Sequence, residues 1–202
     1  MADMPARDAG ARKRLSKESR LVQLLDVARQ LVAAEGTDAL TLGRLAEAAG
    51  ITKPTVYDHF GTRQGLLAAL YREFDAHQAE LFDAALSASR ATLDDKARVV
   101  ADSYIACVLA EGREIPGVLA ALDGSPELAM LKRHCQQDYL AKCRDALAPF
   151  AGPQGLSAAG LWAMLGAADA LAGAAVSGEI GHVQARAELY DTVVSLVQRS
   201  KR

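Results

Sequence analysis

Residues 41–60 read TLGRLAEAAGITKPTVYDHF, and this stretch predicts two short helices joined by a tight turn. Thr41 precedes apolar residues at helical spacing and is the expected N-cap of the first helix. Gly50 follows, where a left-handed turn carries no steric penalty for glycine. Thr52 is expected to cap the second helix, which has Pro54 in its first turn, where a missing N–H does no harm.

Apolar residues at helical spacing predict a further helix on each side of this pair. The preceding helix spans about residues 18–35 and ends at Gly36. The following helix begins after its expected N-cap, Thr62, and extends to about residue 87. Its apolar stripe consists of Leu66, Leu67, Leu70, Tyr71, Phe74, His77 and Leu81.

The rest of the chain continues in helical patterns, with no strand-like alternation longer than four residues. The sequence predicts about nine helices in total, and hence an all-α protein. The later helices are expected over residues 94–111, 126–149, 157–177 and 182–199, with a break at 112–117 and a short apolar piece at 118–122.

The expected domain organisation follows from these patterns and from the distribution of charge. Residues 1–17 form a basic N-terminal arm, residues 18–75 a first helical domain, and residues 76–202 a larger helical domain. Residues 1–72 carry eleven Lys and Arg against eight Asp and Glu, whereas residues 73–202 carry twelve against seventeen. The first third of the chain is therefore basic and the remainder acidic.

The overall composition is that of a folded globular protein. The chain has 202 residues, of which 50% are hydrophobic and 24% charged, and its net charge of −2 excludes a uniformly basic nucleic-acid coat protein. Five basic residues lie within residues 12–20, a segment that is either a solvated terminus or an arm that touches a polyanion.

The cysteines and the N-terminus indicate a reducing, cytoplasmic environment. The three cysteines are odd in number and include no CxxC pair, which argues against a disulfide framework and against a zinc finger. The N-terminus has no apolar stretch, so no signal peptide is expected. No metal or cofactor is expected.

The helix pair and its basic surroundings are typical of a helix-turn-helix, although helical hairpins in ordinary bundles look similar. In a helix-turn-helix, the N-terminal residues of the second helix reach base edges in the major groove of DNA. Lys53 can donate to guanine or to a phosphate, and Thr55 can contact a base edge. Tyr57 and His59 can reach different phosphates. The predicted DNA contacts of this helix are Thr52, Lys53, Pro54, Thr55, Tyr57 and His59.

Residues 21–70 resemble the N-terminal DNA-binding domain of the tetracycline-repressor (TetR) family of bacterial regulators. The resemblance lies in an alanine and a glycine before the turn, a Tyr-x-His-Phe ending, and a basic residue followed by leucines in the next helix. These residues are Ala49, Gly50, Tyr57, His59, Phe60, Arg63, Leu66 and Leu67. The chain departs from the family pattern at Leu31, where phenylalanine is common. Gln64 and Gly65 replace two acidic residues, so the Glu of a capping box is missing.

The resemblance implies a ligand-responsive transcriptional regulator, with a repressor as the expected form. It implies a homodimer on a palindromic double-stranded DNA operator, released when a small molecule enters a cavity in the larger domain. Thr41 and Arg63 would lie near phosphates, and Arg44 would point toward DNA or solvent. Two C-terminal helices of each subunit would form a four-helix interface. The interface residues predicted there are Gly160, Ala163, Ala167, Ala170, Ala174, Leu189 and Val193.

The effector is expected to be hydrophobic or cationic. Trp162, the only tryptophan, could stack on a planar ligand, and Asp169 is the only charge within residues 157–177. Asp169 could also pair with an arginine across an interface or face water. The predicted cavity residues, each of which could instead belong to the core, are Tyr104, Cys107, His134, Tyr139, Trp162 and Asp169.

Alternative interpretations of the same residues stay open. The same fold could act as a cysteine-based redox sensor. An all-helical enzyme is less favoured, because no nucleophile–base pair, glycine-rich phosphate loop or HExxH motif is present. His134, Cys135 and Asp138 have a spacing that a metal could use. Residues 157–177 are apolar enough to span a membrane, but they consist mainly of Ala and Gly with Asp169 in the middle, which favours a buried or interface helix.

Overall fold

The computed structural model describes residues 16–110, 117–118, 121 and 124–202, and every regular element within them is helical. The predicted all-α class is therefore confirmed. The break expected at 112–117 and the apolar piece expected at 118–122 lie mostly outside the described residues, as does the arm up to residue 15. Of the basic residues expected in the arm, Lys17 and Arg20 stand in the first helix.

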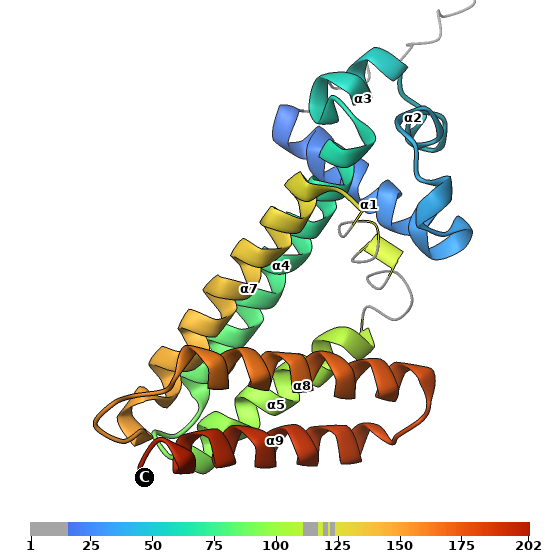
Figure 1. Cartoon of the computed structure of the whole chain (residues 1–202). Coiled ribbons are helices and arrows are strands. Elements are labelled where there is room, and N and C mark those ends of the chain that lie inside the picture. Colours follow the sequence, from blue (N-terminus) through green and yellow to red (C-terminus); the bar gives the residue numbers. More distant parts are fainter. Residues whose placement is uncertain (1–15, 111–116, 119–120, 122–123) are drawn as a thin grey trace, which may run out of the picture.

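The N-terminal part consists of three helices that lead into a long fourth one (Figure 1). The bounds are α1 Lys17–Glu35, α2 Leu42–Ala49, α3 Lys53–Phe60 and α4 Arg63–Ala88, with a 3-10 turn, η1 Thr37–Ala39, between α1 and α2. The four helices agree closely with the expected ranges, whereas η1 was not expected.

Local capping explains where most of these helices begin. The side-chain oxygen of Thr41 accepts from the N–H of Arg44, and that of Thr62 accepts from the N–H of Gly65. Gly50 ends α2 in the left-handed conformation. The prediction that the Thr52 side chain caps α3 with a hydrogen bond is wrong. Thr52 occupies the N-cap position of α3, but its hydroxyl is paired with another hydroxyl and accepts no backbone N–H.

Within the described residues, the larger part contains four further helices and a short 3-10 turn, and residues 117–118 and 121 are also helical. The bounds are α5 Leu93–Ala110, α7 Pro126–Leu147, η2 Ala148–Phe150, α8 Ala158–Ser177 and α9 His182–Arg199. Helices α5, α8 and α9 pack on one another, and α7 lies along α4 (Figure 1). Helix α4 therefore belongs to both parts, because it begins beside α3 and ends against α5.

Two hydrophobic clusters share the length of α4. The first contains the inner faces of α1 to α4 and ends on α4 at Tyr71, while the second begins on α4 at Phe82. The expected stripe is wrong at its end, because His77 is exposed, Leu81 is 52% exposed and its neighbour Phe82 is buried instead. Three residues from beyond α5 complete the first cluster: Val118, Leu128 and Cys135.

Helix α8 is the one helix of the described residues that is long and apolar enough to cross a membrane by length and composition. It buries Leu161, Met164 and Leu165 in the second cluster and packs against α5 and α9. A core helix of this kind passes the same test of length and composition.

Candidate nucleic-acid interface and effector region

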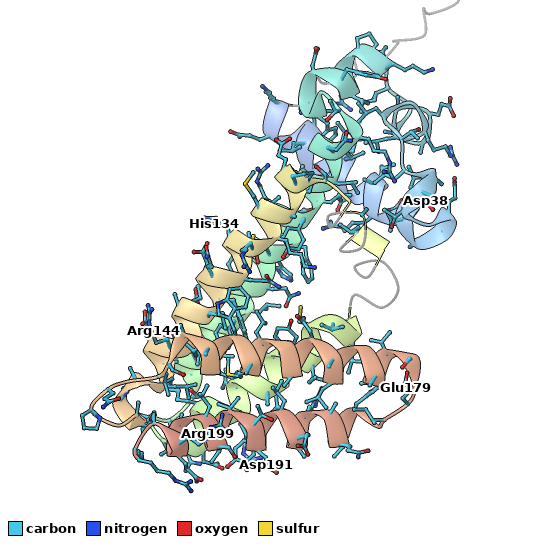
Figure 2. All side chains as sticks on the ribbon, viewed as in Figure 1. Asp38, His134, Arg144, Glu179, Asp191 and Arg199 are labelled. Carbon is cyan, nitrogen blue, oxygen red and sulfur yellow. The ribbon has the colours of Figure 1, made fainter. Side chains whose placement is uncertain are left out.

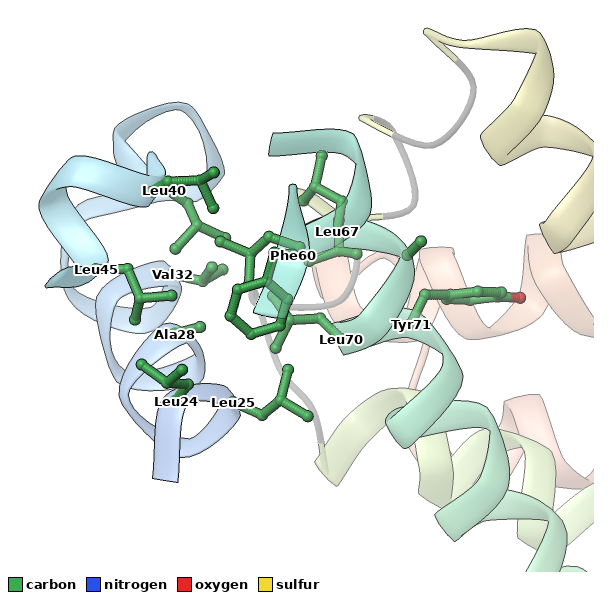
Figure 3. Packing of buried hydrophobic residues seen from close by; sticks show 14 of the residues in the cluster. Leu24, Leu25, Ala28, Val32, Leu40, Leu45, Phe60, Leu67, Leu70 and Tyr71 are labelled. Carbon is green, nitrogen blue, oxygen red and sulfur yellow. The ribbon is translucent and has the colours of Figure 1, made fainter. Parts of the chain in front are cut away.

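The outer face of α3 presents the residues that were predicted to contact DNA. Lys53 and Pro54 are exposed, and Tyr57 has 52% of its surface exposed. On the opposite face, Val56 and Phe60 are buried in the first cluster, with Phe60 central in Figure 3. Helix α3 is thus fixed from behind by apolar packing and leaves its polar side free for a partner.

Helices α2 and α3 form one continuous surface at their N-terminal ends. The side chain of Lys53 lies over Gly43, since a Cβ at Gly43 would be 3.8 Å from the Lys53 Cε and 3.9 Å from its Nζ. The same point is 4.0 Å from the hydroxyl oxygen of Thr41. A cation and a hydroxyl therefore flank the start of α2, where free backbone N–H groups favour anions.

Two other predicted DNA contacts on α3, Thr55 and His59, are less exposed. The hydroxyls of Thr52 and Thr55 lie 2.9 Å apart, so one donates to the other. Thr55 and His59 are half-buried, and the His59 ring lies 6.0 Å from the Phe60 ring. Their contacts with DNA stay predictions, and Thr52 and Thr55 would act as a pair.

Arg44 and Arg63 both have partners within the chain. The Arg44 Nε donates to a carboxylate oxygen of Glu35 at 3.1 Å, and this pairing raises the pKa of Arg44 and lowers that of Glu35. Arg63 donates to the carbonyl oxygens of Leu40 at 2.8 Å and Thr37 at 2.7 Å. Arg63 therefore ties the start of α4 to η1, and its predicted phosphate contact would have to share the guanidinium with these bonds.

Gly65 departs from the family pattern for a steric reason. A Cβ at this position would collide with the carbonyl oxygen of Phe60. The first turn of α4 therefore approaches the end of α3 more closely than any other residue would allow. This close approach constrains how α3 is oriented relative to α4.

Part of the predicted effector site comes together between α5, α7 and α8. The Tyr104 hydroxyl on α5 donates to the Asp169 carboxylate on α8. The Tyr104 ring lies 5.6 Å from that of Tyr139 on α7, which lies 5.3 Å from that of Phe82 on α4. Burial raises the pKa of Tyr104 and Tyr139 well above the usual value, so both hydroxyls stay protonated. Cys107 stands on α5 three residues after Tyr104 and is half-buried.

Two of the predicted effector residues lie elsewhere. His134 is directed outward from α7 (Figure 2), and its Nε2 lies 3.5 Å from a carboxylate oxygen of Asp138. Trp162 is half-buried, with the Arg133 guanidinium 5.0 Å above its ring. Both residues therefore already have polar or charged neighbours on α7.

The sequence analysis assigned no role in the effector region to Tyr71, Asp75 or Cys135. Burial first, and then groups that include Cys135, Asp75 and Asp169, raise the pKa of Tyr71 above its usual value. Tyr71 was expected only as part of an apolar stripe, and Asp75 one turn later was not considered. Their spacing of four residues on one helix was the available signal.

The alternatives based on cysteine and metal chemistry find little support. Cys135 and Cys143 are buried, and burial raises the pKa of each thiol to about 12. The thiolate is the reactive form, so these two residues are unsuited to redox sensing. Among the residues described, no three His, Cys, Asp or Glu side chains gather as a metal site would require. Cys135 faces inward whereas His134 and Asp138 face solvent.

A shallow depression of about 340 Å³ is lined by residues of α4, α5 and α7. Its lysines are already engaged, since the Lys142 Nζ lies 2.5 Å from a carboxylate oxygen of Asp83 and the Lys96 Nζ donates to the Leu86 carbonyl oxygen. The depression is open to solvent.

The predicted dimer residues divide by exposure. On α8, Ala163 and Ala170 are exposed, and Gly160, Ala167 and Ala174 are half-buried. On α9, the prediction is wrong for Leu189 and Val193, which have no exposed surface and pack in the chain's own second cluster. Their spacing on α9 marked a buried face, and a partner cannot reach them.

Comparisons with known proteins agree with this geometry. Residues 24–70 match the family model described as bacterial regulatory proteins, tetR family. Over 59 residues the chain is 37% identical to the HTH-type transcriptional repressor AcnR of Corynebacterium glutamicum, covering 29% of this chain and 31% of AcnR. Over 131 residues it is 28% identical to the HTH-type transcriptional regulator AlkX of Mycobacterium tuberculosis, covering 62% of this chain and 59% of AlkX. The chain thus matches less than two thirds of either relative.

A solved structure extends the similarity to the larger domain. The transcriptional regulator FadR from Bacillus subtilis, in complex with stearoyl-CoA, superposes with a TM-score of 0.72 at 20% identity. The match covers 86% of this chain and 97% of that chain. At this identity the comparison establishes a shared fold over both parts of the molecule.

Proposed function

Because this chain belongs to the tetR family of bacterial regulatory proteins, we propose that it is a cytoplasmic, ligand-responsive repressor. It binds a palindromic DNA operator as a homodimer and releases it when a small molecule occupies the larger domain. It needs no cofactor and catalyses no reaction.

The observation that carries this proposal is the exposed polar face of α3. Lys53, Pro54 and Tyr57 are exposed on a helix whose other side is buried, and Lys53 lies beside Thr41 at the start of α2. Base edges are read by the N-terminal residues of such a helix, while the flanking helix contacts phosphates. Lys53 and the Thr52–Thr55 pair would read bases, and Thr41, Tyr57 and His59 would hold phosphates.

A homodimer is proposed through the outer surface of α8 and α9. Ala163 and Ala170 are exposed on α8, and the small residues Gly160, Ala167 and Ala174 are half-buried on the same helix. Small side chains at these positions allow a second helix to approach closely. Val183, at the start of α9, is 82% exposed and adds apolar surface near the α8–α9 turn. A two-fold axis there would present two α3 helices about 34–36 Å apart, one turn of DNA.

Release of DNA is proposed to pass through α4 and through the residues that join the two clusters. Val118, Leu128 and Cys135 pack with the helix-turn-helix core although they follow α5 in the chain. A ligand that shifts α5 or α7 would therefore move residues that support α1 and α4. A preference of about 1–3 kcal/mol for the DNA-free arrangement is enough for induction.

Selection of DNA from a randomised duplex library tests the proposed activity. The protein should enrich a palindrome whose half-sites are centred about one helical turn apart. A duplex with one half-site scrambled serves as the matched control and should bind much more weakly. Recovery of DNA without any sequence enrichment would contradict the proposal.

A further inference from the structure

We propose that Thr37 is a positioning residue for operator binding. It joins residues 117–118 of the larger domain to the first turn of α4, and through that turn to the recognition helix α3. This inference deepens the proposed function and rests on it, since the relay through Thr37 would carry the signal that releases DNA. The relay acts beside α4, by a route that does not run along the length of that helix.

The first link is the contact between Gly117 and Thr37. A Cβ at Gly117 would collide with the Thr37 hydroxyl oxygen and would lie 3.5 Å from the Thr37 Cβ, so only the absence of a side chain allows this approach. Val118, the next residue, is 3% exposed within the first cluster and anchors the segment against the helix-turn-helix core. Groups packed without space between them must move together. A displacement of residues 117–118 toward η1 would therefore displace Thr37.

The second link is the backbone carbonyl of Thr37. It accepts from the Arg63 guanidinium at 2.7 Å, and the Leu40 carbonyl accepts from the Nε of the same group at 2.8 Å. Leu40, which follows η1, has no exposed surface and is held in the core. Two donors of one planar guanidinium fix its position relative to both carbonyls. Thr37 thus contacts the larger domain with its side chain and the start of α4 with its backbone.

The third link joins Arg63 to α3. Arg63 is the first residue of α4, and two residues later a Cβ at Gly65 would collide with the carbonyl oxygen of Phe60, the last residue of α3. Phe60 is buried, so the end of α3 cannot separate from the first turn of α4 without opening the core. Tyr57, an exposed predicted phosphate contact, lies one turn before Phe60. A shift of Arg63 would therefore reorient the surface that is proposed to contact DNA.

The burial pattern of α4 favours the route through η1 over a route along the helix. Coupling between sites is carried by packed side chains, hydrogen bonds and rigid elements. Over residues 72–81 of α4 no residue is buried, so this stretch acts mainly as a rigid element. The contact at η1 supplies both packing and hydrogen bonds and reaches the helix-turn-helix without crossing that stretch. The two routes differ in their dependence on Arg63, whose bonds to η1 are needed only for the relay.

Gly117→Ala forces the displacement and tests the relay without any effector. Fluorescence anisotropy with the selected operator measures affinity below the unfolding temperature of each variant. Gly117→Ala should weaken binding at least about fivefold, because the new methyl group pushes Thr37. Adding Thr37→Ala should restore binding to within about twofold of the parent, whereas Thr37→Val keeps the branched shape and should not restore it.

Gly124→Ala is the matched control, in the same connection between α5 and α7. A Cβ at Gly124 would lie 3.4 Å from the Ala121 carbonyl oxygen, which is an ordinary contact. This variant should bind the operator as the parent does. A loss equal to that of Gly117→Ala would reject the relay, because any added methyl group in the connection would then have the same effect.

Arg63→Met tests the second link. Because this change removes both bonds to η1, adding Gly117→Ala should alter operator affinity by less than about twofold relative to Arg63→Met alone. An undiminished loss in this background, or equal binding by Gly117→Ala and the parent, rejects the relay and leaves the proposed function intact. A parent that binds no operator rejects the proposed function and the relay together.

Hydrogen exchange supplies a readout that does not depend on the folding of Gly117→Ala. Coupling between sites is reciprocal, so saturating operator should change the exchange of the amides at residues 117–118 in the parent. The change should disappear in Arg63→Met at saturating operator, while the amides of α3 still respond to DNA. Unchanged exchange at residues 117–118 in the parent, or an equal change in Arg63→Met, would overturn the inference.

Discussion

Arg63 shows how one side chain can unite parts of the chain that are distant in sequence. Its guanidinium donates to carbonyl oxygens 23 and 26 residues earlier, at Leu40 and Thr37. These carbonyls belong to the η1 connection between α1 and α2, which has few other local bonds. Hydrogen bonds from a charged group to carbonyls inside a fold are stronger than neutral ones. Arg63 therefore stabilises the helix-turn-helix before any DNA is bound.

Arg63→Met tests this structural role. The variant should lower the free energy of unfolding by about 1–3 kcal/mol, because two backbone carbonyls lose a charged donor. Chemical denaturation in the absence of DNA measures the change. Arg72→Met, an exposed arginine on α4, is the matched control and should stay within about 0.5 kcal/mol of the parent. Equal losses in the two variants would mean that the carbonyl bonds contribute nothing.

At the scale of elements, α4 and the residues after α5 hold the two parts together. Gly117 lies so close to η1 that a Cβ would collide with the Thr37 hydroxyl. Val118, the next residue, is 3% exposed within the first cluster. The contact therefore joins the larger domain to the same connection to which Arg63 donates its hydrogen bonds.

A double-mutant cycle tests the contact between Gly117 and Thr37. Gly117→Ala alone should destabilise the protein, because the new methyl group meets the Thr37 hydroxyl. Thr37→Ala removes that hydroxyl and should restore much of the loss when the two changes are combined, with a coupling of about 0.5–3 kcal/mol. Additive effects in urea denaturation would show that the two residues do not touch.

The same elements show how far the sequence could predict the structure. Helix ends were predictable, because Thr41, Gly50 and Thr62 act through bonds within one turn. The partners of Arg63 depend on packing between distant segments, and a local pattern cannot specify them. The spacing of Leu189 on α9 marks a buried face, but it cannot tell whether that face packs on the same chain or on a partner. Leu81 failed for a related reason, since α4 changes the face that it buries where it passes from one cluster to the other.

The candidate sites divide in the same way. The exposed polar face of α3, which is proposed to contact DNA, was predictable, because its residues lie within one short helix and its polar and apolar sides alternate with helical spacing. The effector region combines residues from α4, α5, α7 and α8, so the sequence could nominate Tyr104, Tyr139 and Asp169 but could not specify their contacts with one another or with Phe82.

For the whole molecule, the proposed function requires two copies. Half of a palindrome offers one α3 too little contact for tight binding at physiological salt, whereas a dimer doubles the contacts and fixes their spacing. The outer surface of α8 and α9 supplies exposed Ala163, Ala170 and Val183 for such an interface, while the core of each chain stays intact.

Ala170→Arg tests the dimer without disturbing the fold. The residue is exposed, so the arginine meets no atom of its own chain core but introduces a charge and bulk at the proposed interface. Light scattering at micromolar concentration should show a dimer for the parent and a monomer for the variant. Ala84→Arg, an exposed change on α4, is the control and should stay dimeric. A parent that is monomeric under these conditions would contradict the proposed assembly.

The central claim is that the exposed face of α3 binds DNA, and one titration tests it most directly. Fluorescence anisotropy with the selected operator compares the parent with Lys53→Ala/Tyr57→Phe, a pair of exposed changes that should leave the fold intact. Loss of the Lys53 contact alone should weaken binding by roughly 1–3 kcal/mol if it reads a base, and loss of the Tyr57 hydroxyl should weaken binding to all sequences about equally. The account predicts that the folded double variant binds the operator at least tenfold more weakly, as a loss of about 1.4 kcal/mol implies. A folded double variant that binds as tightly as the parent would contradict it.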